Sequence, residues 1–133
     1  MRLLGVDYGR AKIGLARAEG GLAEPWKVVQ VNSWQDAIRK IGTEIEKEKP
    51  DTVVVGVSEG SMGEEQKKFA ESLALTLSLP VKTWDEGLST QDAQLLAIQS
   101  GRGPKKRHEL EDAYAAAVML QSYLDGTESP EGI

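Results

Sequence analysis

The chain has no cysteine, which excludes disulfides and thiolate metal sites and removes any sign of an oxidising compartment. It also lacks an apolar run near the about 20 residues that a membrane span needs, and its N-terminus has no signal-peptide pattern. We therefore expect a soluble cytoplasmic protein. An excess of basic residues is missing too: 21 acidic residues outnumber 16 basic ones. This balance argues against a general coating of nucleic acid, so a polyanionic partner would need a local basic patch.

What is present is typical of one globular domain. The 133 residues are 40% hydrophobic and 28% charged, enough for a single core of ordinary size. We expect the domain to span residues 1–125. Residues 126–133 are polar and predict a flexible C-terminal tail.

Hydrophobic periodicity predicts an α/β fold with the element order β-β-β-α-β-α-β-α-α. Ser33, with Asp36 three residues later, predicts the N-cap of the first helix. The continuous β-branched run at 51–57 predicts a strand buried on both faces. A mixed five-stranded sheet with helices on both faces accommodates this order. The strands are expected at 3–7, 12–17, 26–31, 51–57 and 79–84, and the helices at 33–49, 64–77, 89–100 and 109–124.

Carboxylates stand at the ends of two expected strands and at the start of the last helix. Asp7 ends the first strand, Asp85 and Glu86 follow the fifth, and Asp112 lies in the first turn of the last helix. If the first and fifth strands are parallel and adjacent, these acids converge, and they repel one another unless a cation lies between them. Mg²⁺ or Mn²⁺ suits such oxygen ligands. Two ions about 3.5–4 Å apart can activate water and stabilise the leaving oxygen of a phosphodiester.

Each acid also has a simpler interpretation. Asp7 could initiate a turn by bonding nearby backbone N–H groups. Glu86 could be an exposed loop acid, and Asp112 could favour the helix dipole. We assign Asp85 a structural or outer role. The metal-site hypothesis therefore depends on convergence of the acids and not on any single one.

One basic segment, GRGPKKRH at 101–108, stands out in this acidic chain. Its position shortly before Asp112 favours a role in binding phosphates, although it could be only a solvated connection. The single histidine, His108, could be incidental or could assist proton transfer. The residues that we expect to bind nucleic acid are Arg10, Lys12, Arg102, Lys105, Lys106 and Arg107.

Four motifs, in order and at the right spacing, carry a family resemblance. LLGVDYGRAKIGLA, DTVVVGV, TWDEGLST and EDAYAAAVMLQSYL together resemble the YqgF (RuvX-like) family of the RNase H-like superfamily. Members of that family are described as Holliday junction resolvases and as nucleases that mature the 5′ end of pre-16S rRNA. The first motif alone is weak, because actin-like kinases also begin with an Asp-x-Gly hairpin. The resemblance extends from Arg2 to about Leu124.

The resemblance implies an RNase H-like fold and a metal-dependent endonuclease. The family's three acids fall on Asp7, Glu86 and Asp112, so these residues would be both metal ligands and catalytic groups, with Asp7 bridging two Mg²⁺ or Mn²⁺ ions. Cleavage would leave a 5′-phosphate and a 3′-hydroxyl. The expected partner is pre-rRNA or branched DNA, bound by a monomer or weak homodimer.

Two departures from the family pattern bear on function. Gly87 stands where the family usually has Arg, and the loop GVSEGSMGEEQ lacks the family's Pro and Asn. These changes keep open a non-catalytic module that binds RNA or a ribosome-assembly partner. An actin-like nucleotide phosphotransferase is disfavoured, because that fold needs a duplicated domain and a second phosphate loop.

Overall fold

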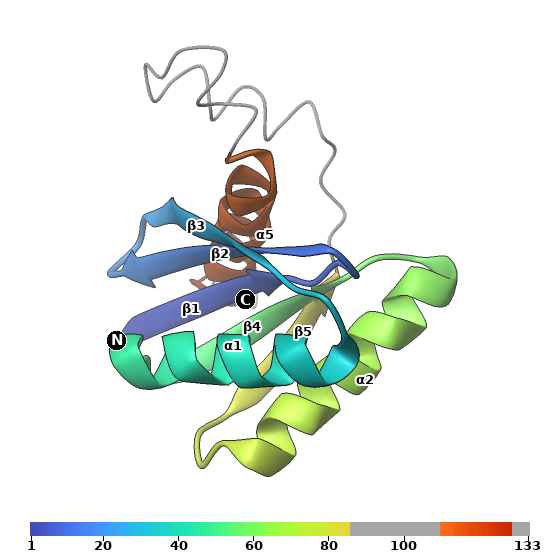
Figure 1. Cartoon of the computed structure of the whole chain (residues 1–133). Coiled ribbons are helices and arrows are strands. Elements are labelled where there is room, and N and C mark those ends of the chain that lie inside the picture. Colours follow the sequence, from blue (N-terminus) through green and yellow to red (C-terminus); the bar gives the residue numbers. More distant parts are fainter. Residues whose placement is uncertain (86–109, 129–133) are drawn as a thin grey trace.

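The computed structural model describes residues 1–85 and 110–128, and it shows a mixed five-stranded sheet with helices on both faces (Figure 1). This confirms the predicted α/β class. The expected helix at 89–100 lies outside the described residues. The strands are β1 (Arg2–Asp7), β2 (Lys12–Glu19), β3 (Ala23–Gln30), β4 (Thr52–Val57) and β5 (Val81–Asp85), and the helices are α1 (Trp34–Glu48), α2 (Gly60–Thr76) and α5 (Glu111–Glu128).

The strand order is β3-β2-β1-β4-β5. The hairpin neighbours β1–β2 and β2–β3 are antiparallel, whereas β1–β4 and β4–β5 are parallel. Strands β1 and β5 are parallel, but the adjacency that was set as a condition for convergence of the acids is not met, because β4 lies between them. The physical reason is the composition of β4: residues Thr52 to Gly56 are all buried, and an interior position in the sheet is where a strand covered on both faces belongs.

The two faces of the sheet hold separate apolar layers. Leu4 and Val6 of β1 belong to the cluster that α1 and α2 cover, whereas Leu3 belongs to the cluster under α5. A Cβ atom added at Gly5 would lie 3.0 Å from the Cβ of Leu120 on α5. Odd-numbered residues of β1 therefore face α5, and even-numbered ones face α1 and α2. Figure 1 shows α5 on the side of the sheet opposite α1 and α2.

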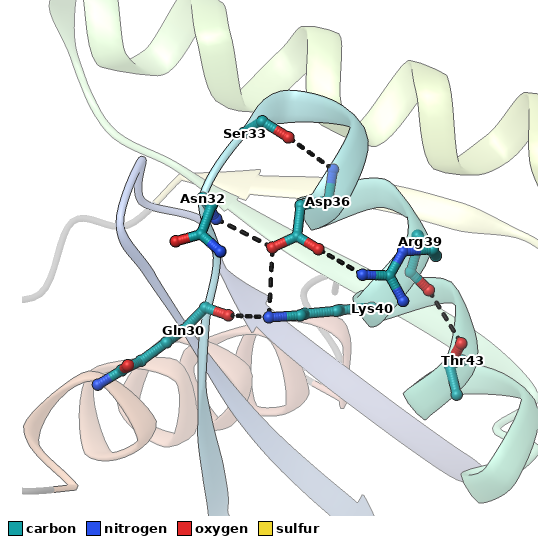
Figure 2. Close-up of polar contacts among 7 residues, drawn as sticks. All are labelled: Gln30, Asn32, Ser33, Asp36, Arg39, Lys40 and Thr43. Carbon is teal, nitrogen blue, oxygen red and sulfur yellow. Dashed lines mark hydrogen bonds and ion pairs between the residues drawn. The ribbon is translucent and has the colours of Figure 1, made fainter.

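The predicted N-cap of α1 is confirmed (Figure 2). The Ser33 hydroxyl oxygen accepts a hydrogen bond from the Asp36 backbone N–H at 3.0 Å. The Asp36 carboxylate accepts in turn from the backbone N–H of Asn32, also at 3.0 Å, and pairs with Arg39 at 2.6 Å and Lys40 at 3.2 Å. The Asn32 N–H, followed by these two cations, holds the pKa of Asp36 below its ordinary value. This end of α1 is thus fixed by charge as well as by the cap.

Two helix boundaries differ from the expected ones. Helix α2 begins at Gly60, within a segment expected to be a loop, and Gly60 has a φ of 81° that favours glycine. Gly63 lies so close to the backbone just after β4 that a Cβ atom there would overlap the carbonyl group of Ser58. Helix α5 continues beyond Leu124 to Glu128, so its last turn occupies the start of the expected tail. Among the helices in the described ranges, none combines the length and apolar character needed to cross a bilayer.

Candidate active site

Asp7 and Asp112 come together around Gly14. Asp7 is the last residue of β1, has an odd number and so faces α5, and its Cα pairs with that of Gly14 on β2. On the other side, Gly14 lies directly against the first turn of α5. A Cβ atom added at Gly14 would be 2.8 Å from the backbone nitrogen of Ala113 and would overlap the carbonyl oxygen of Asp112. Because paired Cα atoms are about 4.5–5.5 Å apart, one glycine brings two of the three predicted acids to the same place.

Asp112 is partly buried beside this junction. Burial raises the pKa of its carboxyl group, the nearby Lys12 ammonium lowers it, and the Glu111 carboxylate raises it, with burial the largest effect. Lys12 begins β2 and shares a face with Gly14, two residues later. The charge of the Asp112 carboxylate is therefore poorly solvated and has a cation nearby.

Asp85, at the end of β5, is placed differently. Val57 of β4 pairs with Asp85, so β4 separates Asp85 from the end of β1 by two strand spacings, roughly 10 Å. Trp84 packs on the α5 side of the sheet, and Asp85, the next residue, is on the other side. There Asp85 lines a cavity of about 450 Å³ with the start of α2. Asp85 is thus turned away from Asp7 and Asp112, in keeping with the structural or outer role expected for it.

The remaining predicted ligand, Glu86, lies outside the described residues. Within residues 1–85 and 110–128, no group of three or more histidine, cysteine or acidic side chains could hold a metal ion. Of the three predicted acids, the described residues include Asp7 and Asp112, which lie together at Gly14. A metal site of three acids needs one more ligand besides these two. The basic residues Arg102, Lys105, Lys106 and Arg107, together with His108 and Gly87, also lie outside the described residues.

The turn between β1 and β2 is held by α2 through Glu65. The Tyr8 hydroxyl donates to one Glu65 carboxylate oxygen at 2.5 Å, and Arg10 Nε donates to the other at 3.0 Å. Burial and, next, the bond to Glu65 raise the pKa of Tyr8 to about 12. The hydrogen bond from Arg10, followed by that from Tyr8, lowers the pKa of Glu65. Arg10, expected to bind nucleic acid, is thus an exposed cation oriented by an ion pair.

Sequence reasoning missed Glu65 and its neighbour Gln66. Gln66 is only 2% exposed and is bonded to the backbone of Tyr8, 58 residues away. The one signal in the sequence was their place on an expected helix. Helical periodicity shows which face is apolar, but it does not show which distant backbone group a polar side chain meets.

Comparison with known proteins identifies the family. The model of the RuvX family, described as Holliday junction resolvase, matches residues 1–126. A relative from Anaeromyxobacter sp. (strain Fw109-5) is 38% identical over 134 residues, covering 95% of this chain and 98% of its own length. A relative from Syntrophus aciditrophicus (strain SB) is 35% identical over 133 residues, covering 94% and 89%. Both are named "Putative pre-16S rRNA nuclease".

Solved structures show the same fold. The fowlpox virus resolvase, in complex with substrate Holliday junction DNA, has a TM-score of 0.70 at 14% identity and covers 97% of this chain and 100% of its own. RuvC of T. thermophilus, in complex with a Holliday junction substrate, has a TM-score of 0.63 at 17% identity and covers 97% and 98%. At such identity the likeness shows the fold alone, and it confirms the predicted RNase H-like class. With the family model matched over nearly the whole sequence, and with relatives above 30% identity over the same span, this chain belongs to the RuvX family.

Proposed function

We propose that this RuvX-family chain is a metal-dependent endonuclease that cleaves phosphodiester bonds at the 5′ end of pre-16S rRNA. The nuclease class follows from the family match and from the names of the relatives. The observation that carries the mechanism is the meeting of Asp7 and Asp112 at Gly14. Two aspartates whose backbones lie on either side of one glycine, with Asp112 partly buried, favour a divalent cation as their counter-charge.

The donor set fits Mg²⁺ or Mn²⁺, which prefer oxygen ligands. Asp7 and Asp112 would hold the metal, with Glu86 as the third ligand. Glu86 is the residue after Asp85 in the sequence, and its role as a ligand is part of this proposal. When bound, two such ions would supply an activated water and stabilise the leaving oxygen.

The basic residues would hold the substrate backbone. Lys12 is close enough to Asp112 to affect its pKa, which places a cation beside the proposed metal ligands. Arg10, on the turn that follows Asp7, presents a side chain that is 74% exposed. We assign both residues to phosphate contacts. The same role is proposed for Arg102, Lys105, Lys106 and Arg107. Such contacts position nucleic acid without reading its sequence, and they weaken as salt rises.

We favour pre-rRNA over a DNA junction as the substrate. The relatives that are 35% and 38% identical over nearly the whole chain carry the rRNA nuclease name, whereas the resolvases with known structures are only 14% and 17% identical. Cutting a junction symmetrically needs two active sites, while trimming one RNA end needs one. A monomer or weak homodimer is sufficient for the RNA reaction.

The test is cleavage of two labelled substrates side by side: single-stranded RNA spanning the pre-16S 5′ region and a four-way DNA junction. Each is incubated with Mn²⁺, Mg²⁺ or EDTA. Asp7→Asn is nearly isosteric and should abolish cleavage in a folded protein. Asp51→Asn makes the same change at the opposite end of the sheet, where the carboxylate accepts from the Arg2 backbone N–H at 2.7 Å, and it should cleave at the wild-type rate.

Each outcome decides between hypotheses. RNA cleavage that is lost with EDTA and with Asp7→Asn supports the proposal. Cleavage of the junction alone would instead make the chain a resolvase. Cleavage by Asp7→Asn at the wild-type rate would refute the assignment of Asp7 as a metal ligand. If the folded wild-type protein binds RNA but cuts neither substrate, the chain is a binding module and Gly87 becomes the first position to restore to Arg.

A further inference from the structure

One buried polar side chain, Gln66 of α2, joins the carboxyl ends of β1 and β4. Its side-chain oxygen accepts from the Ser58 backbone N–H at 2.7 Å and from the Ser58 hydroxyl at 3.1 Å. Its side-chain nitrogen donates to the Tyr8 carbonyl at 3.2 Å. Only 2% of Gln66 is exposed, so the amide uses both its oxygen and its nitrogen inside the protein.

The two backbone groups that Gln66 holds flank the candidate active site. Tyr8 directly follows Asp7. Ser58 follows Val57, which pairs with Asp85, the residue before Glu86. A single amide therefore joins the peptide after Asp7 to the segment that follows β4. Breaking any of these bonds would leave a buried polar group without a partner, which costs the protein stability. The link therefore strongly favours this one arrangement of Tyr8 and Ser58.

Helix α2 holds Tyr8 in three ways, and only one of them acts on the main chain. The Tyr8 ring packs against the Phe69 ring at a centroid distance of 4.6 Å, and the Tyr8 hydroxyl donates to Glu65 at 2.5 Å. These two contacts locate the side chain. The bond from Gln66 locates the carbonyl and so restrains the backbone next to Asp7.

We propose that Gln66 is a positioning residue for the metal site. By tying the Tyr8 carbonyl to Ser58, it fixes the backbone next to Asp7, and so tunes metal affinity without touching the metal. The inference rests on the proposed function, because the ligands are the ones assigned there.

Two substitutions separate the parts of this link. Gln66→Met removes all three hydrogen bonds while keeping an unbranched side chain of similar length. Gln66→Glu keeps an oxygen for the two Ser58 donors but places a carboxylate against the Tyr8 carbonyl. Leu73→Val is the matched control on the same helix, because Leu73 is fully buried in the same apolar cluster.

The experiment is a calorimetric titration of the full-length protein with Mn²⁺ alone, alongside thermal unfolding and steady-state cleavage of the RNA. We expect Gln66→Met to bind Mn²⁺ about tenfold more weakly, at the low end of the 10- to 100-fold losses seen for outer partners of metal ligands. Its kcat should fall while its KM for RNA changes little. Gln66→Glu should lose at least as much affinity, because it replaces the bond to the Tyr8 carbonyl with a repulsive contact. Leu73→Val should lower the melting temperature and leave Mn²⁺ affinity unchanged.

Asp7→Asn separates failure of this inference from failure of the proposed function. If wild type and Asp7→Asn bind Mn²⁺ equally, the metal ligands themselves are wrong. If Asp7→Asn loses affinity but folded Gln66→Met binds as wild type does, only the positioning role is overturned. If Gln66→Met does not fold, Gln66→Glu decides, and wild-type affinity in that variant overturns the role. Equal loss of affinity in Leu73→Val would assign the effect to general destabilisation and overturn it as well.

Discussion

Replacing Gly14 with Ala should damage the active site more than it damages the fold. Glycine is not needed at this position for its backbone angles, because the positive-φ glycines in the described residues are Gly20 and Gly60. What Gly14 provides is the close approach of β2 to the first turn of α5. A methyl group would be 2.8 Å from the nitrogen of Ala113 and would overlap the carbonyl oxygen of Asp112, and both of these are backbone atoms.

The size of the effect follows from that overlap. A carbon atom and a nonbonded heavy atom need a separation of about 3.5 Å, so the first turn of α5 must move away from β2 by on the order of 1 Å. Overpacking of this kind costs about 1–3 kcal/mol, and we expect the upper part of that range because a backbone cannot rotate aside. Moving Asp112 by about 1 Å relative to Asp7 should lower the cleavage rate by roughly 100-fold.

Gly5→Ala is the matched control. It presses on the same helix further along, where the Cβ of Leu120 would be 3.0 Å away and its Cδ2 3.3 Å. The contact there is tight but does not overlap any backbone atom, so we expect a smaller cost of about 1 kcal/mol and an unchanged cleavage rate. The assays are urea denaturation and single-turnover RNA cleavage with Mn²⁺. Wild-type cleavage by Gly14→Ala, or an equal loss of rate in Gly5→Ala, would refute the argument that Gly14 sets the distance between the two acids.

Three other predictions concern the first helix and the basic segment. Ser33→Ala should lower the free energy of unfolding by about 1 kcal/mol, measured by urea denaturation, because it removes the N-cap bond. Folding lowers the pKa of Asp36, so the Asp36 carboxylate stabilises the protein above the unfolded pKa, and this stabilisation is lost as pH falls through the folded pKa. The difference in free energy of unfolding between wild type and Asp36→Asn should therefore be larger at pH 7 than at about pH 3. Changing Lys105, Lys106 and Arg107 together to Ala should weaken RNA binding and flatten its dependence on salt, and an unchanged salt slope in a filter-binding assay would remove them from the interface.

Much of the fold was predictable because local signals agree with the final packing. The β-branched run of β4 indicated a strand buried on both faces, and it is one. Ser33 was the correct cap. The order of the strands was not predictable in the same way, because a burial pattern shows that a strand is interior but not which strands lie beside it. That is why the adjacency of β1 and β5 could be stated only as a condition.

Two predicted helix boundaries were wrong because tertiary contacts set where these helices begin and end. A glycine-rich segment is typical of a loop, yet Gly60 and Gly63 permit α2 to start early and to pack closely on the chain after β4. The end of α5 is similar. The Trp84 indole donates to the Ser122 hydroxyl at 3.1 Å, and its ring lies so close to Gly126 that a Cβ atom there would be 2.7 Å away. Docking against β5 therefore extends α5 beyond the last apolar residue of its periodic pattern.

The candidate site was partly predictable because its acids break the local pattern. An acid at the end of an apolar strand is unusual, which drew attention to Asp7, and the approach of Asp112 follows from the position of α5 against β2. The residues that brace the site gave no such signal. Glu65 meets Arg10 and Tyr8 across 55 and 57 positions, so the network exists only once α2 has docked.

Asp7, the last residue of β1, and Tyr8, the residue after it, face opposite sides of the sheet. Successive side chains of a strand point to opposite faces, so Asp7 is directed toward α5 and Asp112, while Tyr8 is directed toward α2. A shift of the β1 register by one residue would exchange them, burying a carboxylate among Phe69 and Trp34 and exposing an aromatic ring beside α5. Gly5 opposes that shift, because the larger side chain of Leu4 or Val6 in its place would meet Leu120 of α5. The close packing of β1 under α5 therefore keeps the proposed metal ligand on the side where its partner acid lies.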